Sequence, residues 1–182
     1  MQSPLRRITN TTEDGKSFSP AISGDGRIVA FESTEDIANA GGSEGFRALR
    51  ANVSVDPPTF LQMGAARAPA PAISQDGSRI TFAAKENPLG TNNDFNSEIF
   101  LYDGAKLNQI TNTSPADLSS RALNGNFLPS ISDDGRYVAF SSNRNLTGQN
   151  SDGNFEIYVY DSVSLSISQI TNSTGIVGST DA

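Results

Sequence analysis

SPAISGDGRIVAFES, at residues 19–33, is the stretch that decides the fold, because the chain contains it in three variants. It returns as APAISQDGSRITFAA at 70–84 and as LPSISDDGRYVAFSS at 128–142. The Asp-Gly pairs begin at Asp25, Asp76 and Asp134, a spacing of about 50–60 residues that indicates a structural repeat. The chain is therefore predicted to be built from copies of one supersecondary unit.

Each copy is predicted to form four short strands. The first ends at the Asp-Gly pair, which is typical of a tight turn because Gly accepts positive φ and Asp bonds its own backbone. β-branched and aromatic runs at 28–31, 80–82 and 137–140 favour a second strand. Third strands are expected at 98–102 and 156–160, and fourth strands at 109–111 and 169–171; in the first copy their register stays open. Four strands per repeat of about 40–50 residues are typical of a β-propeller blade.

The predicted fold class is all-β, an incomplete propeller of about three four-stranded antiparallel blades with an extra N-terminal strand. We assign residues 11–68 to blade one, 69–113 to blade two, 114–173 to blade three and 174–182 to a tail. Residues 1–10 match only the end of a repeat, so they are expected to be the outer strand of a preceding blade. Helix is expected for a turn or two at most, at 34–40 or 115–123.

The repeat P-x-[IW]-S-x-D-G-x-x-[IV]-A-F, followed by [DE]-I-[FY]-x-x-D and x-[IL]-T, resembles that of TolB-type propellers over nearly the whole chain. Ile22, Ile73 and Ile131 stand where that family often has Trp. The resemblance implies a six-bladed ring, and propellers need about 4–8 blades to close. Either the chain is a piece of a longer protein, which the leftover strand at 5–9 favours, or copies associate to complete the ring.

The two ends of such a stack are expected to be association surfaces. Ordinary blade sequence stands at both ends, although repeat proteins usually cover their ends with polar caps. Side chains that should face a neighbouring blade are among Ile28, Ala30, Phe31, Tyr137, Val138 and Phe140. We therefore predict a homo-oligomer, unless missing blades of a parent chain cover these faces.

The composition excludes several kinds of site. The 182 residues include no His and no Cys, which rules out a Ser-His-Asp triad, a thiol nucleophile and a typical zinc site. A net charge of −7 repels phosphate backbones, so nucleic acid is not an expected partner. No apolar run approaches the roughly 20 residues of a membrane span, and no signal peptide is visible in this chain.

Two motifs that could carry chemistry are interpreted as loops. Residues 41–45 match G-x-S-x-G, but a nucleophile elbow needs a strand–turn–helix setting and a His base. Asn150, Asp152, Asn154 and Glu156, mirrored at 92–98, place oxygens at alternate positions, yet the EF-hand spacing is not met. The predicted inner strands, 18–23, 70–74 and 127–132, contain no carboxylate. We expect no catalytic residue, no metal and no cofactor, with calcium at the second motif as the alternative.

The resemblance to TolB-type proteins implies a non-enzymatic scaffold that binds a protein or ligand in the bacterial cell envelope, in a periplasmic or secreted location. Recognition is concentrated in loops on a rigid frame, so we expect contacts from the fourth-to-first strand loops at 11–17 and 114–126. The candidate contact residues are Asp117, Arg121, Asn124 and Asn126. The alternative is the propeller segment of a prolyl-oligopeptidase-like or other hydrolase, whose catalytic domain would lie outside this chain.

The first third of the chain is rich in arginine, although the whole chain is acidic. A solvated surface explains such a bias, and a patch for an acidic partner is the alternative. The residues concerned are Arg6, Arg7, Arg47, Arg50 and Arg67.

Overall fold

The computed structural model describes residues 5–41, 44–114 and 125–174. Within these ranges the chain forms strands and turns without any helix, so none of the described segments is a helix that could span a membrane. Three four-stranded antiparallel sheets contain the strands. The first is β1 (Ser17–Ile22), β2 (Ile28–Ser33), β3 (Arg47–Asn52) and β4 (Thr59–Gly64). The second is β5 (Ala72–Ile73), β6 (Ile80–Ala84), β7 (Glu98–Tyr102) and β8 (Leu107–Gln109). The third is β9 (Asn126–Ile131), β10 (Tyr137–Ser142), β11 (Glu156–Asp161) and β12 (Ser166–Gln169).

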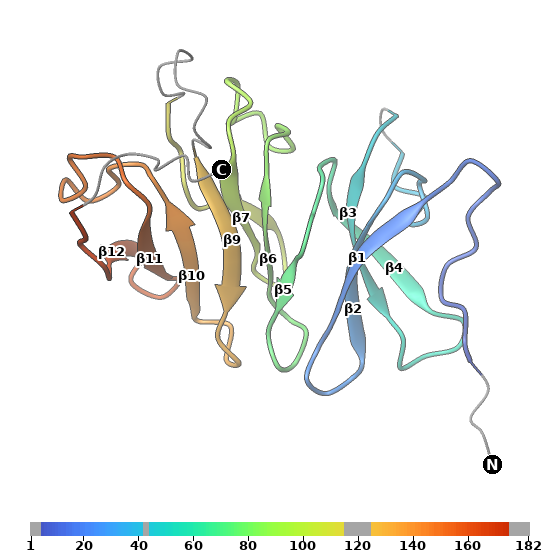
Figure 1. The fold of residues 1–182 in the computed structure, drawn as a ribbon. Coiled ribbons are helices and arrows are strands. Elements are labelled where there is room, and N and C mark those ends of the chain that lie inside the picture. Colours follow the sequence, from blue (N-terminus) through green and yellow to red (C-terminus); the bar gives the residue numbers. More distant parts are fainter. Residues whose placement is uncertain (1–4, 42–43, 115–124, 175–182) are drawn as a thin grey trace, which may run out of the picture.

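The three sheets are propeller blades that stand side by side in an open stack (Figure 1). Within each sheet the strand order follows the chain, so every blade is a simple meander. This confirms the predicted fold class, an all-β incomplete propeller. We call the sheets blades one, two and three. The upper rim is formed by the β2–β3, β4–β5, β6–β7 and β10–β11 loops and by residues 11–16, which bond Thr34 and Glu35 (Figure 1). The lower rim is formed by the turns that join β1 to β2, β3 to β4, β5 to β6, β7 to β8, β9 to β10 and β11 to β12 (Figure 1).

The Asp-Gly turns on the lower rim are built identically in the three blades. In blade one the Ser23 hydroxyl donates to Asp25 Oδ1 at 2.6 Å, and Asp25 Oδ1 also accepts the Arg27 N–H at 3.0 Å. Ser74 with Asp76 and Ser132 with Asp134 make the same bonds. The turn role predicted for these three aspartates is confirmed. Backbone bonds also link successive turns, from Asp25 N to Gln75 O (3.0 Å) and from Gln75 N to Asp133 O (2.9 Å).

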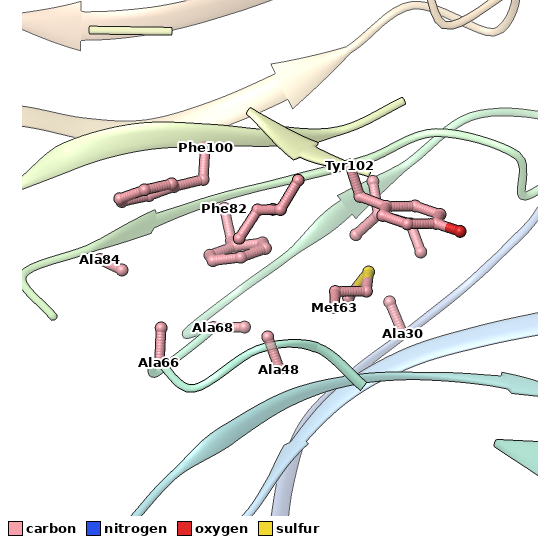
Figure 2. Close-up of a cluster of buried hydrophobic side chains, with 11 residues drawn as sticks. Ala30, Ala48, Met63, Ala66, Ala68, Phe82, Ala84, Phe100 and Tyr102 are labelled. Carbon is pink, nitrogen blue, oxygen red and sulfur yellow. The ribbon is translucent and has the colours of Figure 1, made fainter. Parts of the chain in front are cut away.

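Blades one and two pack through an interface of large against small side chains. Blade two contributes the stacked pair Phe82 and Phe100, with ring centroids 5.9 Å apart, while blade one and the β4–β5 loop contribute mainly alanines (Figure 2). Gly77 completes the fit, because a Cβ at this position would lie 2.5 Å from the Ile28 side chain. Small residues on one side let the sheets approach closely enough to bury both aromatic rings completely.

Blades two and three pack through a second apolar cluster. Ile99 and Leu101 of blade two meet Val138, Phe140 and Tyr158 of blade three, and all five side chains are buried. Phe140 and Tyr158 stack with centroids 5.9 Å apart, as their counterparts Phe82 and Phe100 do. The strand alternation therefore directs one face of each blade toward the preceding blade and the other toward the next.

Two strand predictions need correction. Residues 5–10 form no strand; the segment is held by its side chains, since the Arg6 guanidinium donates to the carbonyls of Val53 (3.0 Å) and Val55 (2.7 Å) in blade one. The fourth strands β8 and β12 end at Gln109 and Gln169, earlier than expected. Thr111 and Thr171, the last residues of the predicted fourth strands, lie beyond β8 and β12. Their hydroxyls donate to the buried Glu98 and Glu156, as described below. No described helical turn occupies 34–40, where Asp36 caps the Ala40 and Gly41 amides; residues 115–123 lie outside the described residues.

The end faces differ from the expectation of two open surfaces. Ala30, Val138 and Phe140 belong to the two interblade clusters, and Ile28 is buried against Gly77 of blade two. Phe31, on the outer face of blade one, is only 3% exposed, because Phe60 and other side chains of its own blade cover it. The outer face of blade three is open: Tyr137 is 40% and Ile157 41% exposed. One end of the stack is thus largely self-covered and the other is not.

We predict that the open face of blade three makes the isolated chain associate at micromolar concentration. Exposed apolar patches of this kind drive association, and a two-fold contact between two such faces would align six blades. Sedimentation velocity should show a dimer that the Ile157→Lys variant converts to monomer, whereas Val163→Lys in the β11–β12 turn should leave it dimeric. A wild-type monomer that persists at high concentration would contradict this.

Candidate functional site

The structure describes only one of the four predicted contact residues. Asp117, Arg121 and Asn124 lie outside the described residues. Asn126 is fully buried, and its amide donates to Ser97 O (3.0 Å), Glu98 Oε2 (2.9 Å) and Thr113 Oγ1 (3.2 Å). Its side chain ties blade three to blade two and is not accessible to a partner from solvent. Burial of Asn126 follows from its place as the first residue of the inner strand β9, which packs against β6 and β7 of blade two.

Glu98 is the centre of this tie. Its fully buried carboxylate accepts bonds from the Thr113 amide (2.6 Å), the Thr113 hydroxyl (2.7 Å), the Thr111 hydroxyl and the Asn126 amide. Four donors satisfy the desolvated charge without a cation. Glu156 repeats the arrangement with Thr171 and Ser173, and hydrogen bonds from Thr171 and then Ser173 hold its pKa below the ordinary value. These glutamates explain why the fourth strands end early.

The alternate-oxygen motif is also part of the loop structure. Asn150 donates its amide to Asn154 O (2.9 Å), and Asn154 donates to Ser173 O (2.7 Å). Asn92 and Asn96 make corresponding bonds in blade two. Glu156 points to its threonine and serine donors, and no group of three or more acidic side chains that could hold a metal occurs in the described ranges. The geometry gives these residues loop-closing hydrogen bonds.

Most of the N-terminal arginines bond this chain's own acceptors. Arg6 pairs with Asp56 (3.1 Å), Arg50 reaches Gly77 O (3.3 Å), and Arg47 contacts Thr34 O and Gly45 O. Arg67 forms a two-pronged bond with Glu32, with N–O distances of 3.0 and 2.7 Å. These contacts account for the arginine bias within the fold. Ser43, of the G-x-S-x-G match, lies outside the described residues.

A largely apolar hollow of about 540 Å³ opens on the upper rim beside the inner strands of blades two and three. Sequence reasoning missed it, because its walls come from four separate segments. They are the β4–β5 loop, the end of β6 with the residues after it, Ser97, and the start of β9. The lining residues are Arg67, Pro69, Ala70, Ala83, Ala84, Lys85, Glu86, Ser97, Phe127 and Leu128.

Comparison of the three blades explains why the hollow exists. In blade one Phe18, at the start of β1, and Phe46, directly before β3, form an aromatic pair with ring centroids 6.3 Å apart. Phe127 and Phe155 form the corresponding pair in blade three, at 6.2 Å. Blade two has Pro69 and Ser97 at the two matching positions. The volume that two phenyl rings occupy in the sister blades is therefore open in blade two. Aligning the three repeats residue by residue is the signal that could have revealed it.

The backbone around the hollow repeats an unusual conformation. Ser19, Ala70 and Leu128 precede the proline of each inner strand and have φ of 53°, 48° and 51°. Left-handed φ is uncommon for residues other than glycine, and here it accompanies a register shift in the inner strands of blades one and three. Leu128 is consequently 78% exposed at the mouth of the hollow. Strained backbone of this kind is concentrated at functional sites.

Charged groups stand at one side of the hollow. Burial of the Glu32 carboxylate would raise its pKa, but hydrogen bonds from Arg67 and from the Ala68 amide outweigh this, and the pKa lies below its ordinary value. The Glu32 bond raises the pKa of Arg67, with a weaker attraction from Glu86. The Arg67 guanidinium also lies 3.9 Å from the centre of the Phe46 ring. Arg67 is thus held in place by partners on both sides.

We predict a pH dependence from the Glu32–Arg67 pair. Since the pKa of Glu32 is lowered on folding, its stabilisation is complete above the ordinary value of 4.5 and is lost as the pH falls through the lower folded-state pKa. At neutral pH, Glu32→Gln should lower the urea concentration at the midpoint of unfolding. The difference in midpoint between the variant and the wild type should become smaller as the pH falls through the lower folded-state pKa of Glu32. A gap that stays constant with pH would show that the charge of Glu32 does not contribute.

The fold, as distinct from the function, has clear relatives among solved structures. TolB from Acinetobacter baumannii matches 88% of this chain with a TM-score of 0.52 and 22% identity. A puromycin-hydrolyzing peptidase from Mycobacterium tuberculosis matches 87% with a TM-score of 0.54 and 14% identity. One chain from a structural study of two prolyl endopeptidases matches 88% with a TM-score of 0.53 and 15% identity.

This chain covers only 33%, 24% and 22% of those chains, respectively. No protein-family model matches the sequence, and no curated protein matches it. The likeness establishes the fold of an incomplete β-propeller.

Proposed function

We propose that this chain is a non-enzymatic binding scaffold that recognises a protein partner in the bacterial cell envelope, in a periplasmic or secreted location. The observation that carries the proposal is the upper rim, where the β4–β5 loop, the β6–β7 loop and the start of β9 surround an apolar hollow on a rigid frame. Such concave, mainly apolar sites with a few polar groups are where proteins bind ligands. The TolB-like fold supports the envelope setting by analogy.

A second candidate is the propeller segment of a hydrolase. The likeness to peptidases that contain propellers favours it, and in that case the upper rim would face a catalytic domain outside this chain. The chain itself contains no His, so no Ser-His-Asp triad can form within it. The two candidates use the same surface for different neighbours.

Photo-crosslinking from single positions tests the proposal. A benzophenone side chain is placed at exposed upper-rim positions, Glu13 or Asn93, and at exposed lower-rim positions, Lys106 or Val163. In cells of the source organism we expect a crosslinked partner protein from the upper rim only. Crosslinks to a hydrolase domain of the same polypeptide would favour the second candidate. Equal crosslinking from both rims would contradict both.

A further inference from the structure

We propose that the hollow in blade two binds a neutral aromatic side chain of the partner that carries an N–H or O–H donor, a tryptophan or a tyrosine. The inference rests on the proposed function, and it names the chemistry of what the upper rim recognises. Three observations carry it: the missing aromatic pair, a buried carboxylate oxygen without a partner, and the balance of charges around the opening.

The first observation concerns shape. At the upper-rim end of the first and third strands, blades one and three contain the aromatic pairs Phe18–Phe46 and Phe127–Phe155. Blade two has Pro69 and Ser97 at these positions and leaves a hollow of about 540 Å³ beside them. Phe127 lines the hollow, so an aromatic ring that enters would meet a ring wall. Aromatic pairs contribute stabilisation beyond the area that they bury. A partner's ring would complete in blade two the pattern that the sister blades make from their own side chains.

The second observation concerns a hydrogen-bond acceptor. Glu86 lines the hollow, and its Oε2 has no hydrogen-bond partner among the described residues; because this atom has almost no accessible area, the side chain would turn toward the hollow to accept a ligand's donor. A buried carboxylate oxygen without a donor is costly, and a ligand that supplies the donor relieves that cost. Phenylalanine could fill the space but has no donor, whereas tryptophan and tyrosine combine an apolar ring with one N–H or O–H.

The third observation concerns charge. Arg67 and Lys85 line the same hollow as Glu86, and Arg67 is already paired with Glu32. The positive charges of Arg67 and Lys85 would repel a lysine or arginine side chain of the partner. The negative charge of Glu86 would repel an acidic side chain. A neutral donor satisfies the unpaired oxygen without either repulsion. Tryptophan and tyrosine are also the residue types most enriched among the dominant contacts of protein interfaces.

Indole is the probe that tests the inference, with 1-methylindole as its matched control. The chain contains no Trp, so indole emission reports the probe alone. For a fragment of this size we expect saturable binding with a Kd on the order of a millimolar. We expect 1-methylindole, which lacks the N–H, to bind at least about fivefold more weakly, the effect of one lost hydrogen bond.

Three variants locate the binding. Pro69→Phe restores the residue type of the sister blades at an exposed position and should abolish binding of both probes. Val163→Phe adds the same ring in the β11–β12 turn, outside the hollow, and should leave binding unchanged. Glu86→Leu should remove the preference for indole over 1-methylindole while both still bind; this comparison decides the matter if Pro69→Phe does not fold.

The outcomes separate this inference from the proposed function. Absence of saturable indole binding, equal binding of the two probes to the wild type, or unchanged binding in folded Pro69→Phe overturns the aromatic site, even if upper-rim crosslinks are found. Indole binding with the expected preference upholds the site. If crosslinks are then absent from the upper rim, the scaffold function fails while the site stands.

Discussion

Replacing Phe82 by alanine is expected to destabilise the fold by about 3–5 kcal/mol, the usual cost of removing a buried phenylalanine. Phe82 is fully buried between blades one and two, and it stacks on Phe100. The alanines that face it from blade one cannot move inward to fill the space, because the turns of the two blades are joined by a backbone bond from Asp25 to Gln75. The loss is measured from urea unfolding followed by circular dichroism.

Val163→Ala is the matched control for this prediction. Val163 is 71% exposed in the β11–β12 turn, and a surface truncation of this kind changes stability by no more than about 0.5 kcal/mol. If Phe82→Ala were as mild as Val163→Ala, the first interblade cluster would contribute little to the fold.

Glu98→Gln is expected to lower the free energy of unfolding by about 2–3 kcal/mol. The glutamine amide group would face the four donors that now bond the carboxylate, and its N–H₂ cannot accept a hydrogen bond from them. The carboxylate now serves Thr111, Thr113 and Asn126, which come from the end of one blade and the beginning of the next. The substitution keeps the size of the side chain, so a loss reports the hydrogen bonds and the charge instead of packing. Thermal and urea unfolding of the purified variant measure it.

Glu156→Gln makes the same chemical change at the equivalent position of blade three. Glu156 bonds Thr171 and Ser173 of its own blade but receives no bond from a following inner strand in the part of the chain that the structure describes. We therefore expect a smaller loss than for Glu98→Gln. Equal losses would show that the link from Glu98 to Asn126 does not hold blades two and three together.

The repeat predicted the blades well because turn and strand chemistry are local. Ser23 and Asp25, with their two counterparts, fix the first turn of each blade through bonds within a few residues. The alternation of β-branched and aromatic residues then sets the second strand. Such features need no knowledge of the neighbouring blade, so they could be read from sequence alone.

Features that depend on contacts between blades could not be read in this way. Asn126 looks like a polar loop residue in sequence, but it is buried because Glu98 and Thr113, both outside its own blade, supply its hydrogen-bond partners. Phe31 is among the side chains predicted to face a neighbouring blade, yet Phe60 and other side chains of its own blade cover it. The hollow in blade two depends on Pro69 and Ser97, which are unremarkable until they are compared with Phe18 and Phe46.

The central claim is that the three blades form one rigid stack, since the upper rim and its hollow exist only if they do. Nuclear Overhauser contacts measured on the isolated chain test this most directly. We predict contacts from the Phe82 ring to the methyl groups of Ala48 and Met63 across the first interface, and between the methyl groups of Leu101 and Val138 across the second. Contacts confined to side chains within single blades would contradict the account.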